Sequence, residues 1–169
     1  MQRINQKYIN NLVLGALRED LKPNGDITTK LLDTKNKIAK AKIISKQKGV
    51  ISGIDFCKAA FKILEKKSKF SAKIKDGKKI KKNQTIAEIT AKIKTILIAE
   101  RTALNFLNHA SGISTITNQY VSKVNNKTKI CCTRKTTPNL RLLEKYAVKK
   151  GGGYNHRYNL SDEVLIKEN

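Results

Sequence analysis

The order of predicted elements near the carboxyl end of the chain constrains its fold most. Residues 129–132 (KICC) predict a short apolar strand, and Pro138 suits the first turn of a helix over residues 139–150. Residues 151–153 (GGG) end that helix, and residues 164–166 (VLI) predict a second short apolar strand. A strand, a helix and a strand in this order form a βαβ-type unit, which implies a parallel sheet or barrel.

Cationic side chains accompany both predicted strands. Arg134 and Lys135 follow the first strand, and Lys167 closes the second. His156 and Arg157 lie in the segment between the helix and the second strand. Because ligands in such folds bind at the C-terminal ends of the strands, we expect these cationic groups to line one mouth.

Such a mouth predicts an anionic ligand with at least two negative groups. Residues 101–169 contain few acids to neutralise it, namely Glu144, Asp162, Glu163 and Glu168. Arg134 and Arg157 can each take a carboxylate through two hydrogen bonds, whereas Lys135 and Lys167 would act as point charges. His156 can donate a hydrogen bond or a proton. Taken singly, each of these residues is also compatible with a structural role.

The formal net charge of +23 raises nucleic-acid binding as an alternative function. Of the 36 basic residues, however, 30 are Lys, and the Lys are scattered through predicted strands with little aromatic interleaving. A lysine-decorated solvated surface explains this distribution better, because single-stranded nucleic acid is bound through stacking aromatic side chains. Arg101, Arg134, Arg141 and Arg157 instead gather in the last 69 residues, which hold only eight Lys.

The first hundred residues predict a mixture of helices and antiparallel strands. Apolar side chains at helical spacing over residues 9–17 predict an amphipathic helix, and residues 54–67 predict a second one. A Pro/Gly/Asp loop (LKPNGDITT) separates the first helix from the half-exposed strand IAKAKIIS. A short strand (VIS) follows, and residues 70–95 predict several short strands with turns at Asp76-Gly77 and Lys82-Asn83.

A long apolar helix is predicted from Leu97 to about Val124, either continuous or broken at Gly112. Arg101 lies on it with Asn105 and Asn108 at spacings that form one polar stripe. On a helix that is otherwise substantially buried, such an arginine needs a partner. That partner would be either a nearby acid or an anionic ligand.

The remaining features of the sequence indicate the cell compartment in which we expect the protein. No stretch of 18 uncharged apolar residues occurs, so no transmembrane helix is expected, and the N-terminus does not resemble a signal peptide. Three cysteines, of which Cys131 and Cys132 are adjacent, do not make a disulfide framework or a zinc site. We therefore expect a cytoplasmic protein.

The stretch TRKTTPNLRLLEKYAV followed by GGGYNHRYNLSDEVLIKEN closely resembles the signature region of the quinolinate phosphoribosyltransferase family. REDLKPNGDITT, GVISGIDFCKAAF and ERTALNFLNHASGIST agree with the same family upstream. The resemblance implies an α/β fold, with an N-terminal α/β sandwich domain over residues 1–112 that includes the long helix. The beginning of an incomplete α/β barrel would follow over residues 113–169.

The resemblance also implies the activity, the cofactor and the partners. Quinolinate would react with phosphoribosyl pyrophosphate to give nicotinate mononucleotide, pyrophosphate and carbon dioxide in NAD biosynthesis, with Mg²⁺ assisting. A homodimer with shared active sites is implied, and neither a membrane nor a nucleic acid is expected as a partner. The alternatives are the related phosphoribosyltransferase-like family associated with molybdenum transport, a basic nucleic-acid-binding protein, and a non-catalytic remnant that only dimerises.

Individual residues inherit roles through this resemblance. Lys135 and Lys167 would be catalytic, and the quinolinate-binding positions would be Thr133, Arg134, Lys135, His156, Arg157 and Lys167. Arg101 matches an arginine supplied to the partner subunit's site, and Arg141 matches a basic position whose role is open. Asn139 stands where the family usually has Gly, and little effect is expected from it.

The length departs from the family, whose members are longer than 169 residues. The expectation is that the magnesium ligands and the segments for the phosphoribosyl group lie downstream of Asn169. We therefore expect a truncated or split chain that holds the dicarboxylate half of the site and is inactive alone.

Overall fold

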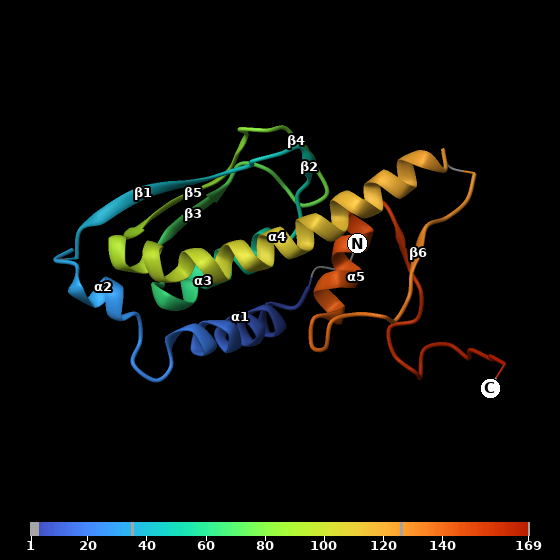
Figure 1. The fold of residues 1–169 in the computed structure, drawn as a ribbon, viewed down its shortest axis with the longest axis horizontal. Coiled ribbons are helices and arrows are strands. Elements are labelled where there is room, and N and C mark those ends of the chain that lie inside the picture. Colours follow the sequence, from blue (N-terminus) through green and yellow to red (C-terminus); the bar gives the residue numbers. More distant parts are fainter. Residues whose placement is uncertain (1–3, 35, 126, 169) are drawn as a thin grey trace.

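One long helix, α4 (Ile93–Lys123), runs through the molecule and contacts most of the other elements (Figure 1). The computed structural model describes residues 4–34, 36–125 and 127–168. The helix is continuous through Gly112, so the predicted alternative of a break there is wrong. It also begins four residues before the predicted start at Leu97. The predicted domain boundary at residue 112 lies inside this helix and stays a prediction.

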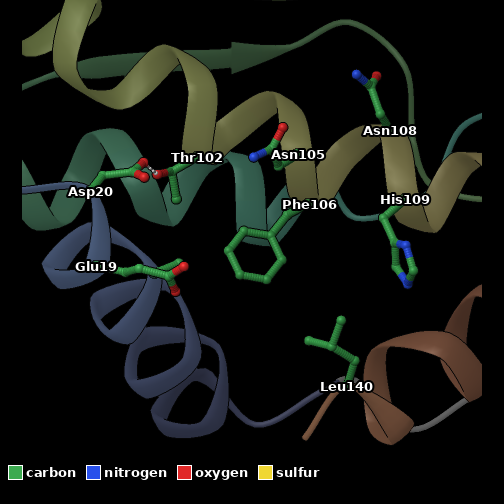
Figure 2. A pocket seen from close by; sticks show the side chains of 9 residues that line it. Glu19, Asp20, Thr102, Asn105, Phe106, Asn108, His109 and Leu140 are labelled. Carbon is green, nitrogen blue, oxygen red and sulfur yellow. Dashed lines mark hydrogen bonds between the residues drawn. The ribbon is translucent and has the colours of Figure 1, made fainter. Parts of the chain in front are cut away.

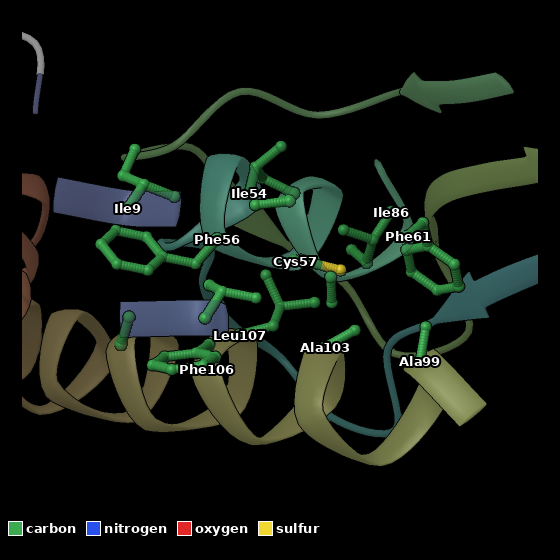
Figure 3. Close-up of a cluster of buried hydrophobic side chains, with 14 of the residues drawn as sticks. Ile9, Ile54, Phe56, Cys57, Phe61, Ile86, Ala99, Ala103, Phe106 and Leu107 are labelled. Atoms are coloured by element: carbon green, nitrogen blue, oxygen red, sulfur yellow. The ribbon is translucent and has the colours of Figure 1, made fainter. Parts of the chain in front are cut away.

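Two helices pack against α4 and form the main core. They are α1 (Gln6–Leu21) and α3 (Ile54–Leu64), and both helices were predicted from the sequence. Phe56 of α3 and Phe106 of α4 stack with ring centroids 5.5 Å apart, among buried aliphatic side chains (Figure 3). Burial raises the pKa of the Cys57 thiol in this core to about 12.

A three-stranded antiparallel sheet packs on α3 and α4, on the side opposite α1 (Figure 1). Its strand order is β1 (Ile38–Ile44), β5 (Thr85–Lys92), β3 (Lys69–Ala72). A small antiparallel pair joins β2 (Gly49–Val50) to β4 (Lys79–Ile80). Exposed and half-buried side chains alternate along β1, which confirms the half-exposed strand. The predicted loop before it contains a short helix, α2 (Ile27–Leu31), because Asp26 accepts the Thr29 backbone N–H at 3.0 Å.

The carboxyl-terminal βαβ unit is present, but its second strand is not the predicted one. Strand β6 (Cys131–Cys132) pairs in parallel with β7 (Tyr154–Asn155), and α5 (Arg141–Lys150) connects them. The prediction of a strand at residues 164–166 is wrong, since this segment has no ladder partner among the described residues and its Val164 side chain is 90% exposed. Tyr154 takes the place beside β6 instead, and its backbone N–H donates to the Ile130 carbonyl at 2.8 Å.

Helix α5 starts two residues later than predicted. Asn139 has a left-handed backbone (φ 65°), so Pro138 and Asn139 lie in a turn before the helix rather than in its first turn. At its other end, a Cβ added to Gly151 would approach the Ser114 carbonyl oxygen to 2.4 Å. Only glycine therefore allows the end of α5 to pack this closely against α4.

Several hydrogen bonds connect the βαβ unit to the rest of the chain, and two of them are buried or half-buried at α5. Ser114 of α4 donates to the Ala147 carbonyl at 2.7 Å, and Tyr146 of α5 donates to the Asp76 carboxylate at 2.8 Å. The same carboxylate accepts the Gly53 and Ile54 backbone N–H groups at the start of α3. Asp76 therefore links α3 with α5 and fixes the βαβ unit against the main core.

Candidate active site

A pocket of about 350 Å³ lies at the carboxyl ends of β6 and β7. Every side chain that the sequence analysis assigned to a substrate site lines it, with the exception of Arg101. The lining residues are Thr133, Arg134, Lys135, His156, Arg157, Leu165 and Lys167. The predicted convergence of cations from distant positions in the chain is therefore present in the fold.

The parallel pairing of two short strands brings these residues together. Thr133, Arg134 and Lys135 directly follow β6. His156 and Arg157 directly follow β7, whereas they were predicted to lie between the helix and the second strand. Because β6 and β7 are parallel, both sets emerge at one edge of the sheet. Lys167 does not close a strand, because it lines the pocket from the exposed irregular segment 164–168.

Local hydrogen bonds orient the side chains in the pocket. The Arg157 backbone N–H donates to Nδ1 of His156 at 2.8 Å, which places the proton of the neutral imidazole on Nε2. One Arg157 guanidinium nitrogen donates to the Glu163 carbonyl at 3.1 Å. The Thr133 hydroxyl accepts the Lys135 backbone N–H at 3.2 Å.

The charge in the pocket is strongly unbalanced. Among the described residues, no hydrogen bond or ion pair engages the charged groups of Arg134, Lys135 or Lys167. Glu163 contributes one acid to this region, with Oε2 3.4 Å from Nδ1 of His156, and its side chain is largely exposed. A multiply charged anion would relieve the mutual repulsion of these cations.

Two basic side chains support the pocket from outside, and neither role was predicted from the sequence. Arg141 donates to the Thr136 hydroxyl at 3.0 Å and to the Tyr158 carbonyl at 3.3 Å, so it joins the segments that follow β6 and β7. Lys145 is buried inside α5 with 2% of its surface exposed. The amphipathic pattern of α5 did not indicate it, because a residue two positions from Leu143 and Ala147 lies on the opposite side of a helix from them.

Arg101 lies outside the cationic pocket, and the expectation of a buried arginine is wrong. Arg101, Asn105 and Asn108 are all exposed. Asn105 and Asn108 line a separate pocket of about 380 Å³ between α1 and α4, where Asp20 accepts the Thr102 hydroxyl at 2.7 Å (Figure 2). The role of Arg101 towards a partner subunit stays a prediction.

The described residues do not form a metal centre. No group of three or more His, Cys, Asp or Glu side chains in residues 4–168, with positions 35 and 126 left aside, could hold a metal ion. These residues therefore do not supply a magnesium site by themselves, and the expectation that the ligands lie downstream of Asn169 stays a prediction. In the same part of the chain, no helix has both the length and the apolar character needed to cross a bilayer.

The fold and the pocket together define an α/β protein with a cationic pocket at the ends of two parallel strands. Two family models match the chain: the quinolinate phosphoribosyl transferase N-terminal domain over residues 26–111, and the C-terminal domain of the same enzyme over residues 113–169. The chain belongs to the quinolinate phosphoribosyltransferase family.

Individual relatives agree with this assignment. A probable nicotinate-nucleotide pyrophosphorylase [carboxylating] of Bacillus subtilis is 38% identical over 97% of this chain and 55% of its own length. A probable enzyme of the same name from Methanocaldococcus jannaschii is 46% identical over 86% of this chain and 51% of its own. The chain thus spans about half the length of these curated relatives.

Solved structures show the same fold. The nicotinate-nucleotide pyrophosphorylase of Francisella tularensis superposes with a TM-score of 0.93 at 38% identity, over 98% of this chain and 59% of that one. The protein of that name from Ehrlichia chaffeensis gives a TM-score of 0.89 at 40% identity, over 99% and 60%. These matches favour the quinolinate family over the molybdenum-transport-associated family and over nucleic-acid binding.

Proposed function

We propose that this chain carries the dicarboxylate-binding part of a quinolinate phosphoribosyltransferase, a pentosyltransferase of NAD biosynthesis. Its substrates would be quinolinate and phosphoribosyl pyrophosphate, and its products nicotinate mononucleotide, pyrophosphate and carbon dioxide. The carrying observation is the convergence of Arg134, Lys135, Arg157 and Lys167 on one pocket at the ends of two parallel strands. The names of the relatives support the reaction.

The pocket suits a planar dianion with two adjacent carboxylates. Arg134 and Arg157 would each take one carboxylate through two parallel hydrogen bonds. Lys135 and Lys167 would act as charges beside the reacting ring, where we assign them a catalytic role, and the Nε2–H of His156 would donate a hydrogen bond. Thr133 shapes the turn that presents Lys135, because its hydroxyl accepts the Lys135 backbone N–H.

In the proposed reaction, the ring nitrogen of quinolinate attacks C1 of the ribosyl group and pyrophosphate leaves with the electrons of the broken C–O bond. The ring nitrogen is then cationic. The bond from the ring to the adjacent carboxylate breaks, carbon dioxide leaves, and the cationic ring stabilises the electron pair until a proton replaces the lost group. The residues of this chain hold the dianion in place and balance its charge, so orientation and preorganised electrostatics supply their catalytic effect.

Three further parts of the proposal concern partners and compartment. No step is assigned to magnesium, because the described residues offer no site for it. A homodimer would let the exposed Arg101 of one subunit reach the pocket of the other. The free thiols of Cys57, Cys131 and Cys132 suit a reducing compartment such as the cytoplasm.

Calorimetric titration of the chain with quinolinate tests the proposal through two conservative substitutions. Arg134→Lys and Arg157→Lys keep the charge but lose the bidentate contact, so each should weaken quinolinate binding by about 1–3 kcal/mol. Arg18→Lys, an exposed position on α1, is the matched control and should leave the affinity unchanged. Unchanged affinity in both pocket variants would contradict the proposal, as would RNA binding that quinolinate does not displace.

A further inference from the structure

The most unusual charged group outside the pocket lining is the ammonium of Lys145. Its side chain is 2% exposed and is among the largest fully buried side chains of the chain. No carboxylate forms a salt bridge with it among the described residues. Burying an ammonium group is strongly unfavourable unless its donors are satisfied. The contacts that it makes in compensation therefore matter.

The ammonium group bridges the ends of the two parallel strands. Nζ of Lys145 donates to the His156 carbonyl oxygen at 2.9 Å and to Sγ of Cys132 at 3.2 Å. Cys132 is the last residue of β6, and His156 is the first residue after β7. Lys145 therefore lies directly behind the segments that carry the pocket residues.

The hydrogen bond from Lys145 to the His156 carbonyl affects the imidazole of His156 through the His156–Arg157 peptide group. The His156 carbonyl and the Arg157 N–H belong to the same planar trans peptide, so they point in opposite directions. Lys145 holds the carbonyl oxygen on one side of the plane. The Arg157 N–H is thereby directed to the other side, where it donates to Nδ1 of His156 at 2.8 Å. The Glu163 carboxylate lies farther from the same nitrogen, at 3.4 Å, so the shorter contact decides that Nδ1 accepts and that the proton of the neutral ring is on Nε2.

We propose that Lys145 is a positioning residue for the anion pocket. By holding the His156–Arg157 peptide, it fixes the tautomer of His156 and the direction in which His156 and Arg157 present their side chains to the ligand. This inference rests on the proposed function for the identity of the ligand, quinolinate. The arrangement of Lys145, the peptide and His156 is independent of that identity.

Three variants separate positioning from bulk stability and from net charge. Lys145→Met fills similar space but donates no hydrogen bond. Lys145→Gln loses the charge and retains an N–H donor for the His156 carbonyl. Lys149→Met makes the same substitution on the same helix at an exposed position and removes the same charge.

Nitrogen-15 NMR of the imidazole rings reports the tautomer of His156, which a purely structural role of Lys145 would not change. The chain has only two histidines, His109 and His156, so each spectrum contains its own reference. At about pH 8.5, where histidine is ordinarily neutral, wild-type His156 should be predominantly the Nε2–H tautomer. Lys145→Met should give a mixture of tautomers at His156, whereas Lys145→Gln and Lys149→Met should keep the wild-type spectrum.

Quinolinate dissociation constants complete the test. Lys145→Met should bind about tenfold more weakly than wild type, which is about 1.4 kcal/mol and typical of one hydrogen bond. Lys149→Met should bind as wild type does, and Lys145→Gln should lose less than Lys145→Met. Equal affinity and an equal His156 tautomer in wild type and Lys145→Met would overturn the inference. If Lys145→Met does not fold, the wild-type spectrum decides, because a wild-type His156 protonated at Nδ1 would also overturn it.

The two proposals fail in different ways. A wild-type chain that does not bind quinolinate contradicts the proposed function, whatever the tautomer of His156. A wild-type chain that binds quinolinate, with a Lys145→Met variant that is identical in both readouts, contradicts only the positioning role.

Discussion

Strand β1 and the ends of β6 and β7 are both rich in cations, yet they place them differently. On β1, Lys40 and Lys42 are exposed, and their neighbours Ala39 and Ala41 face the interior. Lys42 is paired across the ladder with Glu88 of β5, which also forms a salt bridge with Lys73 at 2.9 Å. A hydrogen bond from Lys73 lowers the pKa of this exposed carboxyl.

At the ends of β6 and β7, the cations converge instead of spreading out. Arg134, Lys135 and Lys167 share one pocket and have no acid partner among the described residues. A strand sends alternate side chains to opposite faces, so its lysines spread over solvent, whereas parallel strand ends collect side chains at one edge. The placement of the charge, rather than its total, therefore distinguishes the proposed binding site from the lysine-rich sheet.

The largest expected effect is on the free energy of unfolding, and it tests whether the sheet that contains β1 and the unit that contains β6 and β7 share one core. Phe56→Ala should lower the free energy of unfolding by about 3–5 kcal/mol, because it removes a buried ring that stacks on Phe106. Leu143 and Ala147 of α5 belong to the same buried cluster, so urea unfolding followed by circular dichroism should show one transition. The exposed Leu31→Ala is the control, with a change within about 0.5 kcal/mol. Two separate transitions would show that the regions fold independently.

A smaller effect is expected at the link between the regions. Asp76→Ala should lower the free energy of unfolding by about 2–3 kcal/mol, because two backbone donors of α3 and the Tyr146 hydroxyl lose their acceptor. Tyr146→Phe removes one of these hydrogen bonds and should have a smaller effect. Equal stability of wild type and Asp76→Ala in urea titrations would show that this link contributes nothing.

The same carboxylate predicts a pH dependence. Burial raises the pKa of Asp76 above its ordinary value of 3.8, so the folded state favours the protonated form. The stabilisation from this shift is fully present below pH 3.8 and is lost as pH rises through the raised folded pKa. The difference in unfolding free energy between wild type and Asp76→Asn should therefore fall as pH rises through that window. A difference that rises with pH there would contradict the sign.

The smallest effect is expected on the lysine-rich sheet. Lys40→Gln and Lys42→Gln, alone or together, should change the unfolding free energy by no more than about 0.5 kcal/mol, because both side chains are solvated. Their quinolinate affinity should equal that of wild type. Weaker quinolinate binding in these variants, measured by calorimetry, would remove the distinction between the two cationic regions.

The sequence predicted the pocket residues better than the elements that carry them. Strand β1 and helix α1 followed from apolar spacing, because each buries one face within the chain. The second parallel strand could not be located in this way. Residues 164–166 are more apolar than Tyr154–Asn155, but a two-residue strand is fixed by the position of α5 and not by hydropathy.

Tertiary contacts explain the other differences. The exposure of Arg101 depends on which face of α4 the other elements leave uncovered, and no local pattern encodes that. The capping of α3 by Asp76 joins positions more than twenty residues apart. The role of Lys145 depends on the ends of two strands meeting above one helix, which composition and spacing do not reveal.

The central claim is that the cations at the ends of β6 and β7 bind a dicarboxylate, whereas those of β1 do not. Hydrogen exchange of the chain with and without quinolinate, followed by mass spectrometry, tests it most directly. The account predicts slower exchange in peptides that cover residues 131–137 and 154–167, and unchanged exchange in residues 38–44. Unchanged exchange at both strand ends, or protection confined to the lysine-rich sheet, would contradict it.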